Sequence, residues 1–313
     1  MHLQRTLRDR TGCHGVGLHS GRRIELALLP APVDSGITFV RSDLPCHPEL
    51  RPCLEHLADT TLATTLSVGQ GAQCATVGTV EHLLAAFTGL GIDNARVLVD
   101  GPEVPILDGS AAPFVEMIDA VGIQVQPRTR RTLVIRREVR VADGDKLARI
   151  VPGAGLSITL SLDFDHPLIS PAPVKFVHSE ATFRRQLASA RTFGFLHEVE
   201  ALRARGLARG GSLDNAIVID KYRILNPEGL RFPDECARHK VLDTLGDFSL
   251  FGAPVIGKVT LHRTGHALNA RLVAAVLADP RAYTVLESRP AAAAERGAAT
   301  PAFDLFDGLK GLA

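Results

Sequence analysis

Two short segments carry side chains that could bind a metal ion. His239 and Asp243 are four positions apart, so on a helix they lie on one face, one turn from each other. Asp247 continues the same row by another turn. Far upstream, Glu81 directly precedes His82. Two histidines and one aspartate can supply the protein ligands of an open metal site, and Glu81 would be a base beside it.

Both segments also have simpler interpretations, which the sequence leaves open. On the predicted helix around His239, apolar side chains gather on one side and polar ones on the other, and this pattern taken alone favours a solvated face. Gly246 lies in the polar row. Because glycine costs about 1 kcal/mol in a helix, its position indicates that another group approaches the backbone closely there. Glu81 and His82 could be two surface residues early in a helix, where glutamate also suits the helix dipole.

Two further histidines lie in glycine-containing connections. His266 follows Gly265 just after a predicted strand. It is either a turn residue or, if it faces the same cleft, a general acid or a positive charge beside a developing oxyanion. In the second case Asp247 would hold its imidazole in position. His19 lies in the glycine-rich stretch 15–21, which lacks the lysine of a phosphate-binding loop and the spacing of a dinucleotide site. We expect a tight connection there, with His19 near the substrate.

The stretch from 190 to 219 combines a hydroxyl, two aromatic rings and an apolar stripe. Thr192 is followed by Phe193 and Phe195, which are either core aromatics at a helix exit or part of a site. The stripe comes next, and after it a glycine-rich stretch and a predicted strand at 216–219. The members of the stripe are Leu196, Val199 and Leu202. This order predicts a βαβ-like insert with an apolar inner wall able to hold an acyl chain, although a core helix shows the same stripe.

The predicted elements fall into two halves with a similar order. The first half has strands at 23–28 and 36–41, an amphipathic helix that starts near Val80 and ends near Gly91, a strand at 95–99 and a helix at 113–120. The chain turns polar and basic at 125–132, where we place the domain boundary. The second half has strands at 133–141, 146–151 and 156–163, a helix at 180–190, the helix with His239, a strand at 255–262 and a helix at 268–277. Each half thus runs from strands to a helix with a candidate ligand, a glycine and an apolar strand, which predicts a duplicated α+β unit with its site between the copies.

The composition argues against several classes of protein. A net charge of +1 over 313 residues, with no Trp and two Tyr, gives neither a basic bias nor stacking surfaces for nucleic acid. No apolar run approaches the ~20 residues that span a bilayer, and the N-terminus lacks the apolar core of a signal peptide. Five cysteines without CxxC spacing fit free thiols in a reducing compartment. We therefore expect a cytoplasmic protein without a nucleic-acid partner or membrane insertion.

Six motifs occur in order along the chain. They are Gly15-Val16-Gly17-Leu18-His19, Thr79-Val80-Glu81-His82-Leu83, Pro105-Ile106-Leu107-Asp108-Gly109-Ser110-Ala111, Ala190-Arg191-Thr192-Phe193-Gly194-Phe195, His239-Lys240-x-x-Asp243 and Thr264-Gly265-His266-Ala267-Leu268-Asn269. In combination they resemble the UDP-3-O-acyl-N-acetylglucosamine deacetylases, the zinc amidases of lipid A biosynthesis. The resemblance runs from Gln4 to about Leu277.

This resemblance implies an α+β protein of two similar domains, each a β-sheet with packed helices, which together form a duplicated two-layer sandwich. The helix layers would face each other, and each domain would carry an insert. The domains would be residues 1–127 and 128–280, with an acyl-passage insert at about 194–219 and a C-terminal tail at 281–313.

The implied reaction is hydrolysis of the N-acetyl group of UDP-3-O-(3-hydroxyacyl)-N-acetylglucosamine to the free amine and acetate, the committed step of lipid A biosynthesis. One Zn²⁺ per chain would be the cofactor, with Fe²⁺ as an alternative, and the protein would act as a monomer on this small-molecule substrate. Zinc acidifies water and polarises a carbonyl, and a base and an acid on opposite sides of the amide bond would give a bell-shaped pH profile.

The family pattern also implies a role for each matching residue. The metal ligands would be His82, His239 and Asp243, with Glu81 as the general base. The other catalytic residues would be His266, which protonates the leaving amine or stabilises the oxyanion, Asp247, which orients it, Thr192, which binds the oxyanion, and Lys240, which contacts the substrate.

A further set of residues would bind the rest of the substrate. Those of the acyl passage would be Phe193, Phe195, Leu196, Val199, Leu202, Gly211 and Ser212, and His19 would lie near the substrate. Those near the nucleotide would be Lys146, Asp163, Phe164 and Arg263. Arg263 stands where relatives often have lysine, so the phosphate contact would differ in geometry.

Two rival interpretations concern the same residues. Two histidines and one carboxylate also form the facial triad of non-haem Fe²⁺ oxygenases. The helical spacing of His239 and Asp243, with Glu81 next to His82, favours hydrolysis instead. A binding protein of the same fold without activity is the other rival, and the intact set of Glu81 and the further catalytic residues favours an enzyme.

Overall fold

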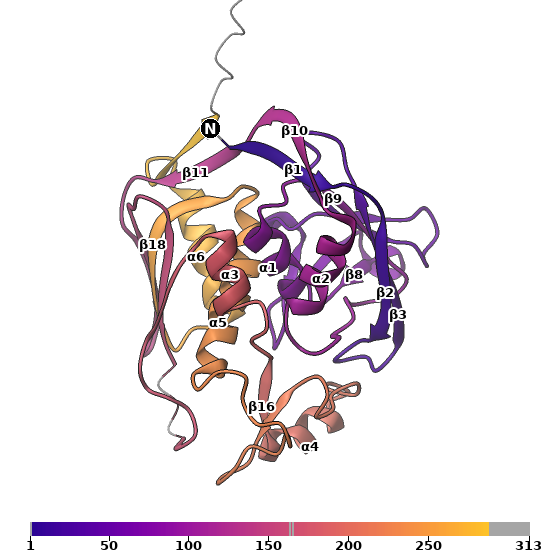
Figure 1. Ribbon diagram of the computed structural model, residues 1–313, viewed down its shortest axis with the longest axis vertical. Coiled ribbons are helices and arrows are strands. Elements are labelled where there is room, and N and C mark those ends of the chain that lie inside the picture. The colour runs from indigo at the N-terminus through magenta and orange to yellow at the C-terminus, as the bar shows by residue number, and fades with distance from the viewer. Residues whose placement is uncertain (1, 163, 165, 288–313) are drawn as a thin grey trace, which may run out of the picture.

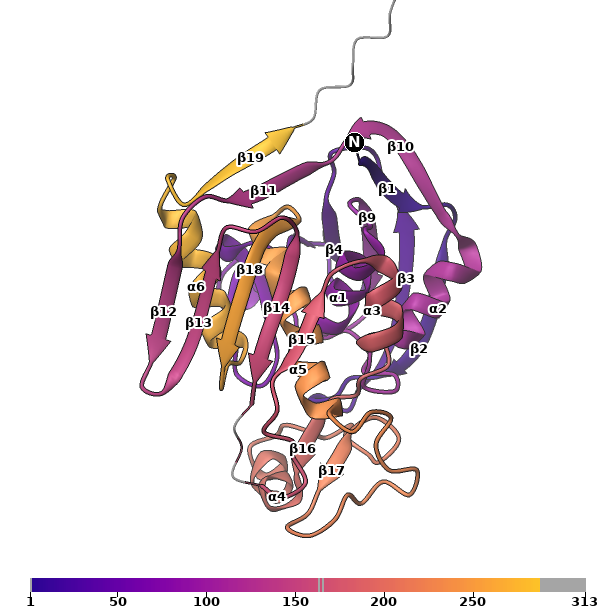
Figure 2. The same ribbon diagram turned by 60° about the vertical axis from the view of Figure 1, so that its left-hand side comes forward.

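Two β-sheets enclose a central group of helices. The computed structural model describes residues 2–162, 164 and 166–287. Figure 1 shows one sheet on each side, with helices α1, α2, α5 and α6 between them. Figure 2 shows the sheet of the second half facing the viewer, with α5 and α6 behind it. Within the described residues, no helix is long and apolar enough to cross a membrane. The mixed α+β class predicted from the sequence is confirmed.

The sheet of the first half has five strands in the order β2-β3-β9-β4-β5, in which only β4 and β9 run parallel. Helix α1 directly precedes the central strand β9, and α2 follows it. The elements are β2 (Thr11–Val16), β3 (Arg23–Pro30), β4 (Ile37–Arg41), β5 (Glu49–Leu50), α1 (Glu81–Leu90), β9 (Ala95–Val99) and α2 (Ala112–Val121).

In the second half, five strands repeat this arrangement in the order β12-β13-β18-β14-β15, in which β14 and β18 run parallel, and two further strands bring this sheet to seven. Helix α5 precedes the central strand β18, and α6 follows it. The elements are β12 (Val139–Asp143), β13 (Lys146–Val151), β14 (Leu156–Ser161), β15 (Val174–Val177), α5 (Glu235–Asp247), β18 (Val255–His262) and α6 (His266–Ala278).

Four further strands lie outside these two five-strand arrangements, and they differ in part from the prediction. β1 (Leu3–Leu7) pairs with β10 (Ile123–Thr129). β11 (Arg131–Ile135) pairs with β18 and with β19 (Tyr283–Glu287). The predicted strand at 133–141 is therefore two strands, because β11 joins β19 whereas β12 joins β13. The segment that was assigned to the tail also begins with a strand, β19. Its pairing with β11 could not be predicted from the local sequence.

Each half carries an extra segment between its last sheet strand and its ligand-bearing helix. In the first half it is a three-stranded sheet of β6 (Leu57–Asp59), β7 (Thr65–Val68) and β8 (Ala75–Val77). In the second half it contains α3 (Glu180–Gln186), β16 (Phe193–Phe195), α4 (Leu196–Ala204) and β17 (Ile217–Ile219). β16 and β17 run parallel, so the predicted βαβ-like insert is confirmed, and it lies at one end of the molecule in both views. Three short 3-10 helices complete the fold at Leu54–His56, Gly71–Gln73 and Phe248–Phe251.

The contact between α1 and α5 brings the two halves together. The apolar stripe of α1 is buried, and the helix ends at Gly91, which adopts a left-handed conformation with φ 70°. A Cβ atom on Gly246 of α5 would lie 2.1 Å from the backbone oxygen of Glu81. The close approach predicted at Gly246 is thus made by the backbone of α1, and it places the start of α1 against the last turn of α5.

Candidate metal centre

The three predicted metal ligands meet in the interior between α1 and α5. His82, His239 and Asp243 are between 1% and 4% exposed, so the solvated-face interpretation of this row is wrong. Asp243 Oδ1 lies 3.2 Å from His239 Nε2 and 3.5 Å from His82 Nε2. Ligand atoms held tetrahedrally by zinc at roughly 2.0–2.1 Å would be about 3.3 Å apart. Within the part of the chain that the structure describes, this is the one cluster of three such residues that could hold a metal ion.

The protonation of these side chains fits a bound cation. His239 Nδ1 lies 3.0 Å from the carbonyl oxygen of Ala190, which accepts its proton and leaves the lone pair of Nε2 facing the site. Burial lowers the pKa of His239 to about 3, so the imidazole is neutral. Asp243 Oδ1 is buried and accepts no hydrogen bond from any described residue. Lone pairs that converge on one point without a donor repel one another, and a cation held between them would satisfy all three.

Lys240 stabilises the charge of the carboxylate ligand from its other side. Burial disfavours the ionised form of Asp243, but the adjacent His239 and the ammonium of Lys240 outweigh burial and hold the pKa of Asp243 well below its usual range. Lys240 Nζ donates to Asp243 Oδ2 at 2.8 Å. Burial lowers the pKa of Lys240, and the carboxylate of Asp243 more than offsets this and raises it. Lys240 therefore stays protonated, with its ammonium 5.7 Å from the ring centre of Phe193.

Glu81 lies next to the ligands in a position suited to a base. Its side chain is 3% exposed, and Oε2 accepts a hydrogen bond from the backbone N–H of Thr64 at 3.0 Å. Its other oxygen lies 3.9 Å from His266 Nε2. Burial raises the pKa of Glu81, although the charges of His266 and His82 oppose the shift. A carboxylate with a raised pKa takes up a proton more readily near neutral pH.

His266 is held by a buried carboxylate. Its Nδ1 lies 3.0 Å from Asp247 Oδ2, which directs Nε2 towards Glu81 and the metal ligands. Burial lowers the pKa of His266, but Asp247 outweighs burial and raises the pKa to about 9. Asp247 in turn accepts from Thr64 Oγ1 at 2.6 Å and from Asn269 Nδ2 at 2.8 Å. The imidazole is thus charged and oriented at neutral pH.

Two residues of this network were not among the predicted site residues. Thr64 lies in the first-half insert, and nothing in its local sequence distinguishes it from the threonines around it. Asn269 ends the motif that contains His266 and lies three residues after it. The helical spacing of these two residues could therefore have placed both on one face. Asn269 is fixed by Thr264, whose hydroxyl donates to Asn269 Oδ1 at 2.8 Å.

The residues predicted for the acyl passage begin beside the metal ligands and extend into the insert. Phe193 packs edge to face on His239, with ring centres 6.5 Å apart. Phe195 and Phe164 continue the aromatic cluster, with ring centres 5.6 Å apart. Helix α4 has no fully buried residue. Its stripe of Leu196, Val199 and Leu202, together with Gly211 and Ser212 beyond it, is half-buried or exposed.

Thr192 is fixed by backbone hydrogen bonds on both sides. Its N–H donates to the carbonyl of Gly109 at 2.8 Å, and its own carbonyl accepts from Ile217 at 2.8 Å. It follows by two residues the carbonyl of Ala190 that contacts His239. The backbone of Thr192 is therefore fixed beside the segment that contacts His239.

The predicted nucleotide residues divide into two groups. Lys146 and Arg263 lie together, because β13 pairs with the end of β18 and both side chains are exposed beside that pairing. Arg263 forms an ion pair with Asp145 of the neighbouring turn. Phe164 lies instead in the aromatic cluster of the insert. Asp163 is outside the described residues.

His19 lies against the insert. The backbone N–H groups of Arg209 and Gly210 donate to the carbonyls of His19 and Leu18 at 3.3 and 3.0 Å. Burial lowers the pKa of His19, with Glu103 opposing, and its Nε2 is buried without a hydrogen-bond partner among the described residues. The tight connection predicted at 15–21 is therefore a contact of the first half with the insert of the second.

A buried pair of histidines with a carboxylate, flanked by a glutamate and a carboxylate-held histidine, is the arrangement typical of a mononuclear metal-dependent hydrolase. Residues 4–278 match the family described as UDP-3-O-acyl N-acetylglycosamine deacetylase. The chain belongs to this family.

Relatives that carry the name UDP-3-O-acyl-N-acetylglucosamine deacetylase match almost the whole chain. The protein of Anaeromyxobacter dehalogenans (strain 2CP-C) is 54% identical over 283 residues, which cover 90% of each chain. That of Myxococcus xanthus (strain DK1622) is 52% identical over 286 residues, covering 91% of this chain and 90% of the relative. That of Syntrophus aciditrophicus (strain SB) is 45% identical over 284 residues, covering 91% and 89%.

Proposed function

We propose that this protein hydrolyses the N-acetyl group of UDP-3-O-(3-hydroxyacyl)-N-acetylglucosamine in a metal-dependent reaction of lipid A biosynthesis. The observation that carries the proposal is the convergence of His82, His239 and Asp243 on one point, with Glu81 and His266 beside it. The names of the relatives supply the substrate.

The metal would be one Zn²⁺ per chain, held by the two histidines and Asp243, with Fe²⁺ as the alternative. When bound, zinc supplies Lewis-acid chemistry that acidifies water and polarises the acetamide carbonyl. All proton transfers fall to residues of the chain itself. The buried carboxyl group of Glu81 takes the proton of the attacking water.

On the other side of the scissile bond, His266 donates a proton. As the C–N bond breaks, the imidazolium of His266 protonates the leaving amine, and acetate is the second product. The pKa of about 9 keeps His266 charged at neutral pH, and Asp247 fixes the orientation of its ring. Thr192 would hydrogen-bond the developing oxyanion, and the ammonium of Lys240 would contact the substrate.

The remaining predicted residues would bind the two ends of the substrate. The insert would form the passage for the 3-hydroxyacyl chain, with walls from Phe193, Phe195, Leu196, Val199, Leu202, Gly211 and Ser212. Lys146 and Arg263 are the cations suited to the diphosphate, and Asp163 and Phe164 would lie near the nucleotide. His19, which packs on the insert, would border the passage.

The fold supports a finer proposal about the architecture. Five strands of each sheet have the same order, with the corresponding pair parallel in both, and β11 adds a second parallel pairing with β18 in the second half. Each sheet has one helix before and one after its central strand. We infer a duplicated two-layer sandwich with domains at 1–127 and 128–280, the helix layers facing each other. Action as a monomer in the cytoplasm completes the proposal.

The test is release of acetate from the UDP-sugar, followed by mass spectrometry with and without a chelator. The metal-loaded protein should release acetate and the chelated protein should not, and Zn²⁺ added back should restore the reaction. If the metal-loaded protein releases no acetate, the proposed function is wrong. If the chelated protein is as active as the loaded one, the metal dependence is wrong.

A further inference from the structure

The turn at 105–111 has no part in the proposed reaction, yet it is hydrogen-bonded to the segment that holds one metal ligand. The N–H of Ala111 donates to the carbonyl of Ala188 at 2.9 Å, and the N–H of Thr192 donates to the carbonyl of Gly109 at 2.8 Å. Between these two bonds lies Ala190, whose carbonyl accepts from His239 Nδ1 at 3.0 Å. The first half of the protein therefore fixes the backbone that orients a ligand of the second half.

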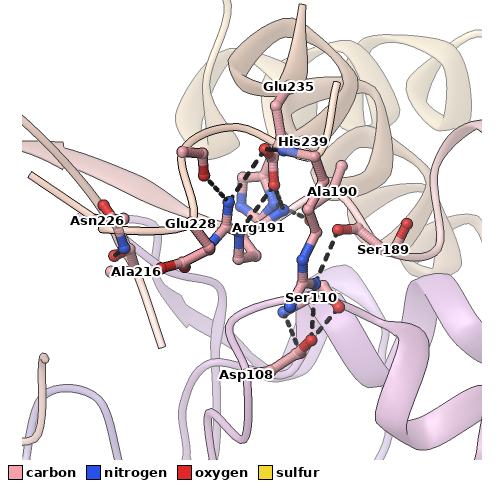
Figure 3. Close-up of polar contacts among 12 residues, drawn as sticks. Asp108, Ser110, Ser189, Ala190, Arg191, Ala216, Asn226, Glu228, Glu235 and His239 are labelled. Carbon is pink, nitrogen blue, oxygen red and sulfur yellow. Dashed lines mark hydrogen bonds and ion pairs between the residues drawn. The ribbon is translucent and has the colours of Figure 1, made fainter. Parts of the chain in front are cut away.

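A buried ion pair fixes the same segment from the opposite side. Arg191 and Glu235 are 1% and 0% exposed. The backbone N–H and Nε of Arg191 both donate to Glu235 Oε1 at 3.0 Å, and Nη2 donates to the carbonyl of Gly229 at 2.6 Å. Arg191 also contacts Glu228 (Figure 3). Glu235 stands one helical turn before His239 on α5, so it links the ligand's own helix to the ligand's hydrogen-bond acceptor.

A second arginine joins both sets of contacts. Arg231 Nη1 donates to Asp108 Oδ2 at 2.8 Å and to the carbonyl of Ser189 at 3.0 Å. Its backbone N–H donates to Glu235 Oε2 at 2.5 Å. Asp108, Arg231 and Glu235, together with the side chain of Arg191, thus hold residues 189–192 in place, and we call these four residues the carbonyl clamp.

The cost of burying charge indicates why such a clamp is present. Removing two ions from water costs several kcal/mol for each ion, and an apolar pair of similar volume is often equally stable or more so. The buried pair of Arg191 and Glu235 is thus a poor means of stabilising the fold. The directed hydrogen bonds of the carbonyl clamp instead restrict the Ala190 carbonyl to one position. A carbonyl that holds Nδ1 sets the tautomer and the ring orientation of a histidine ligand.

We propose that Arg191 and Glu235 are positioning residues that hold the Ala190 carbonyl on His239 Nδ1 and so aim Nε2 at the metal. This inference rests on the metal site of the proposed function. It predicts an effect on metal binding itself, which a merely structural ion pair would not have.

The test compares metal affinity in three variants. Glu235→Gln removes one charge, and Arg191→Met combined with Glu235→Met removes both, so that no charge is left buried and unpaired. Asp234→Asn is the matched control, because Asp234 precedes Glu235 and pairs with Arg238 at 2.5 Å without touching residues 189–192. The readouts are the Zn²⁺ dissociation constant by chelator competition, the visible spectrum of the Co²⁺-loaded protein and thermal unfolding.

We expect both Glu235 variants to bind Zn²⁺ about 10–100-fold more weakly than the wild type and to change the Co²⁺ spectrum, with the control unchanged. If Glu235→Gln fails to fold, the double variant decides. A double variant with wild-type affinity and spectrum would overturn the inference, whatever its thermal stability. If the wild type itself binds no metal, the proposed function fails instead, so the two failures are distinguishable.

Discussion

The two halves have sheets of the same strand order but contribute differently to the candidate centre. The first half supplies Glu81 and His82, both from the first turn of α1. The second half supplies His239, Asp243 and Asp247 along the length of α5. The helices that follow the central strands also differ. Helix α6 begins with His266, which belongs to the candidate metal centre, whereas α2 begins with Ala112 and contributes none of the residues assigned to that centre.

This difference shows how one architecture supports an asymmetric site. The start of α1 meets the last turn of α5 at Gly246, so His82 lies beside Asp243 and Glu81 lies beside His266. The first half can therefore contribute a base and a ligand, while the second provides most of the ligands and the acid. Neither half alone contains a complete site.

The sharpest way to break this division is to remove a ligand from α5. Asp243→Ala should lose the metal, and its turnover should fall at least about 10³-fold. The reason is that the Lewis-acid contribution of several kcal/mol is lost, and each 1.36 kcal/mol corresponds to a tenfold change in rate. Metal content by atomic absorption and acetate release are the measurements. Asp247→Ala is the control and should retain the metal. Equal metal loss in both variants would contradict the assignment of Asp243 as ligand and Asp247 as orienting residue.

The contribution of α1 is tested by Glu81→Gln, which preserves the shape of the side chain. Turnover should fall by about 10²–10⁴-fold, the usual contribution of a general base, while the metal content stays near that of the wild type. Full activity of this variant would show that Glu81 is not the base, and that the base, like the acid, comes from the second half.

The contact between the halves is tested by Gly246→Ala. The new Cβ would lie 2.1 Å from the Glu81 carbonyl oxygen, so α1 must move away from α5. We expect a loss of about 1–3 kcal/mol in the free energy of unfolding, measured with urea, and weaker metal binding. Gly155→Ala is the control, since a Cβ there meets nothing within 4 Å, and it should change stability by less than about 0.5 kcal/mol. Unchanged metal affinity in Gly246→Ala would show that the site tolerates separation of the helices.

The smallest expected effect concerns the acid of the second half. Burial lowers the pKa of His266, but Asp247 outweighs burial and raises the pKa to about 9. The charged acid is therefore present below that pH and is lost above it. Asp247→Asn removes the charge but leaves an acceptor for Nδ1, and the pKa of His266 should fall. The alkaline limb of the pH profile of kcat/KM should then move to lower pH, with the acidic limb unchanged. An alkaline limb that stays in place would show that another group donates the proton.

Much of the secondary structure follows from local patterns. The strands at 95–99, 146–151 and 255–262 have the predicted bounds, because apolar alternation and flanking glycines are local signals. The division of 133–141 into β11 and β12, and the strand β19, depend on pairing partners that are far away in the sequence. Helix α6 begins at His266, two residues earlier than predicted, since Gly265 precedes its first turn.

The candidate site divides in the same way. The sequence by itself determined which side chains could bind a metal and the helical spacing that puts His239 and Asp243 on one face. It could not decide between a solvated face and a buried centre, because burial depends on the other helix. Only the tertiary structure placed α1 against Gly246, brought His82 within 3.5 Å of Asp243 Oδ1 and joined Thr64 to both Glu81 and Asp247. Spacing along a helix is a property of the backbone, whereas convergence of lone pairs from two halves requires the packing that removes water from between them.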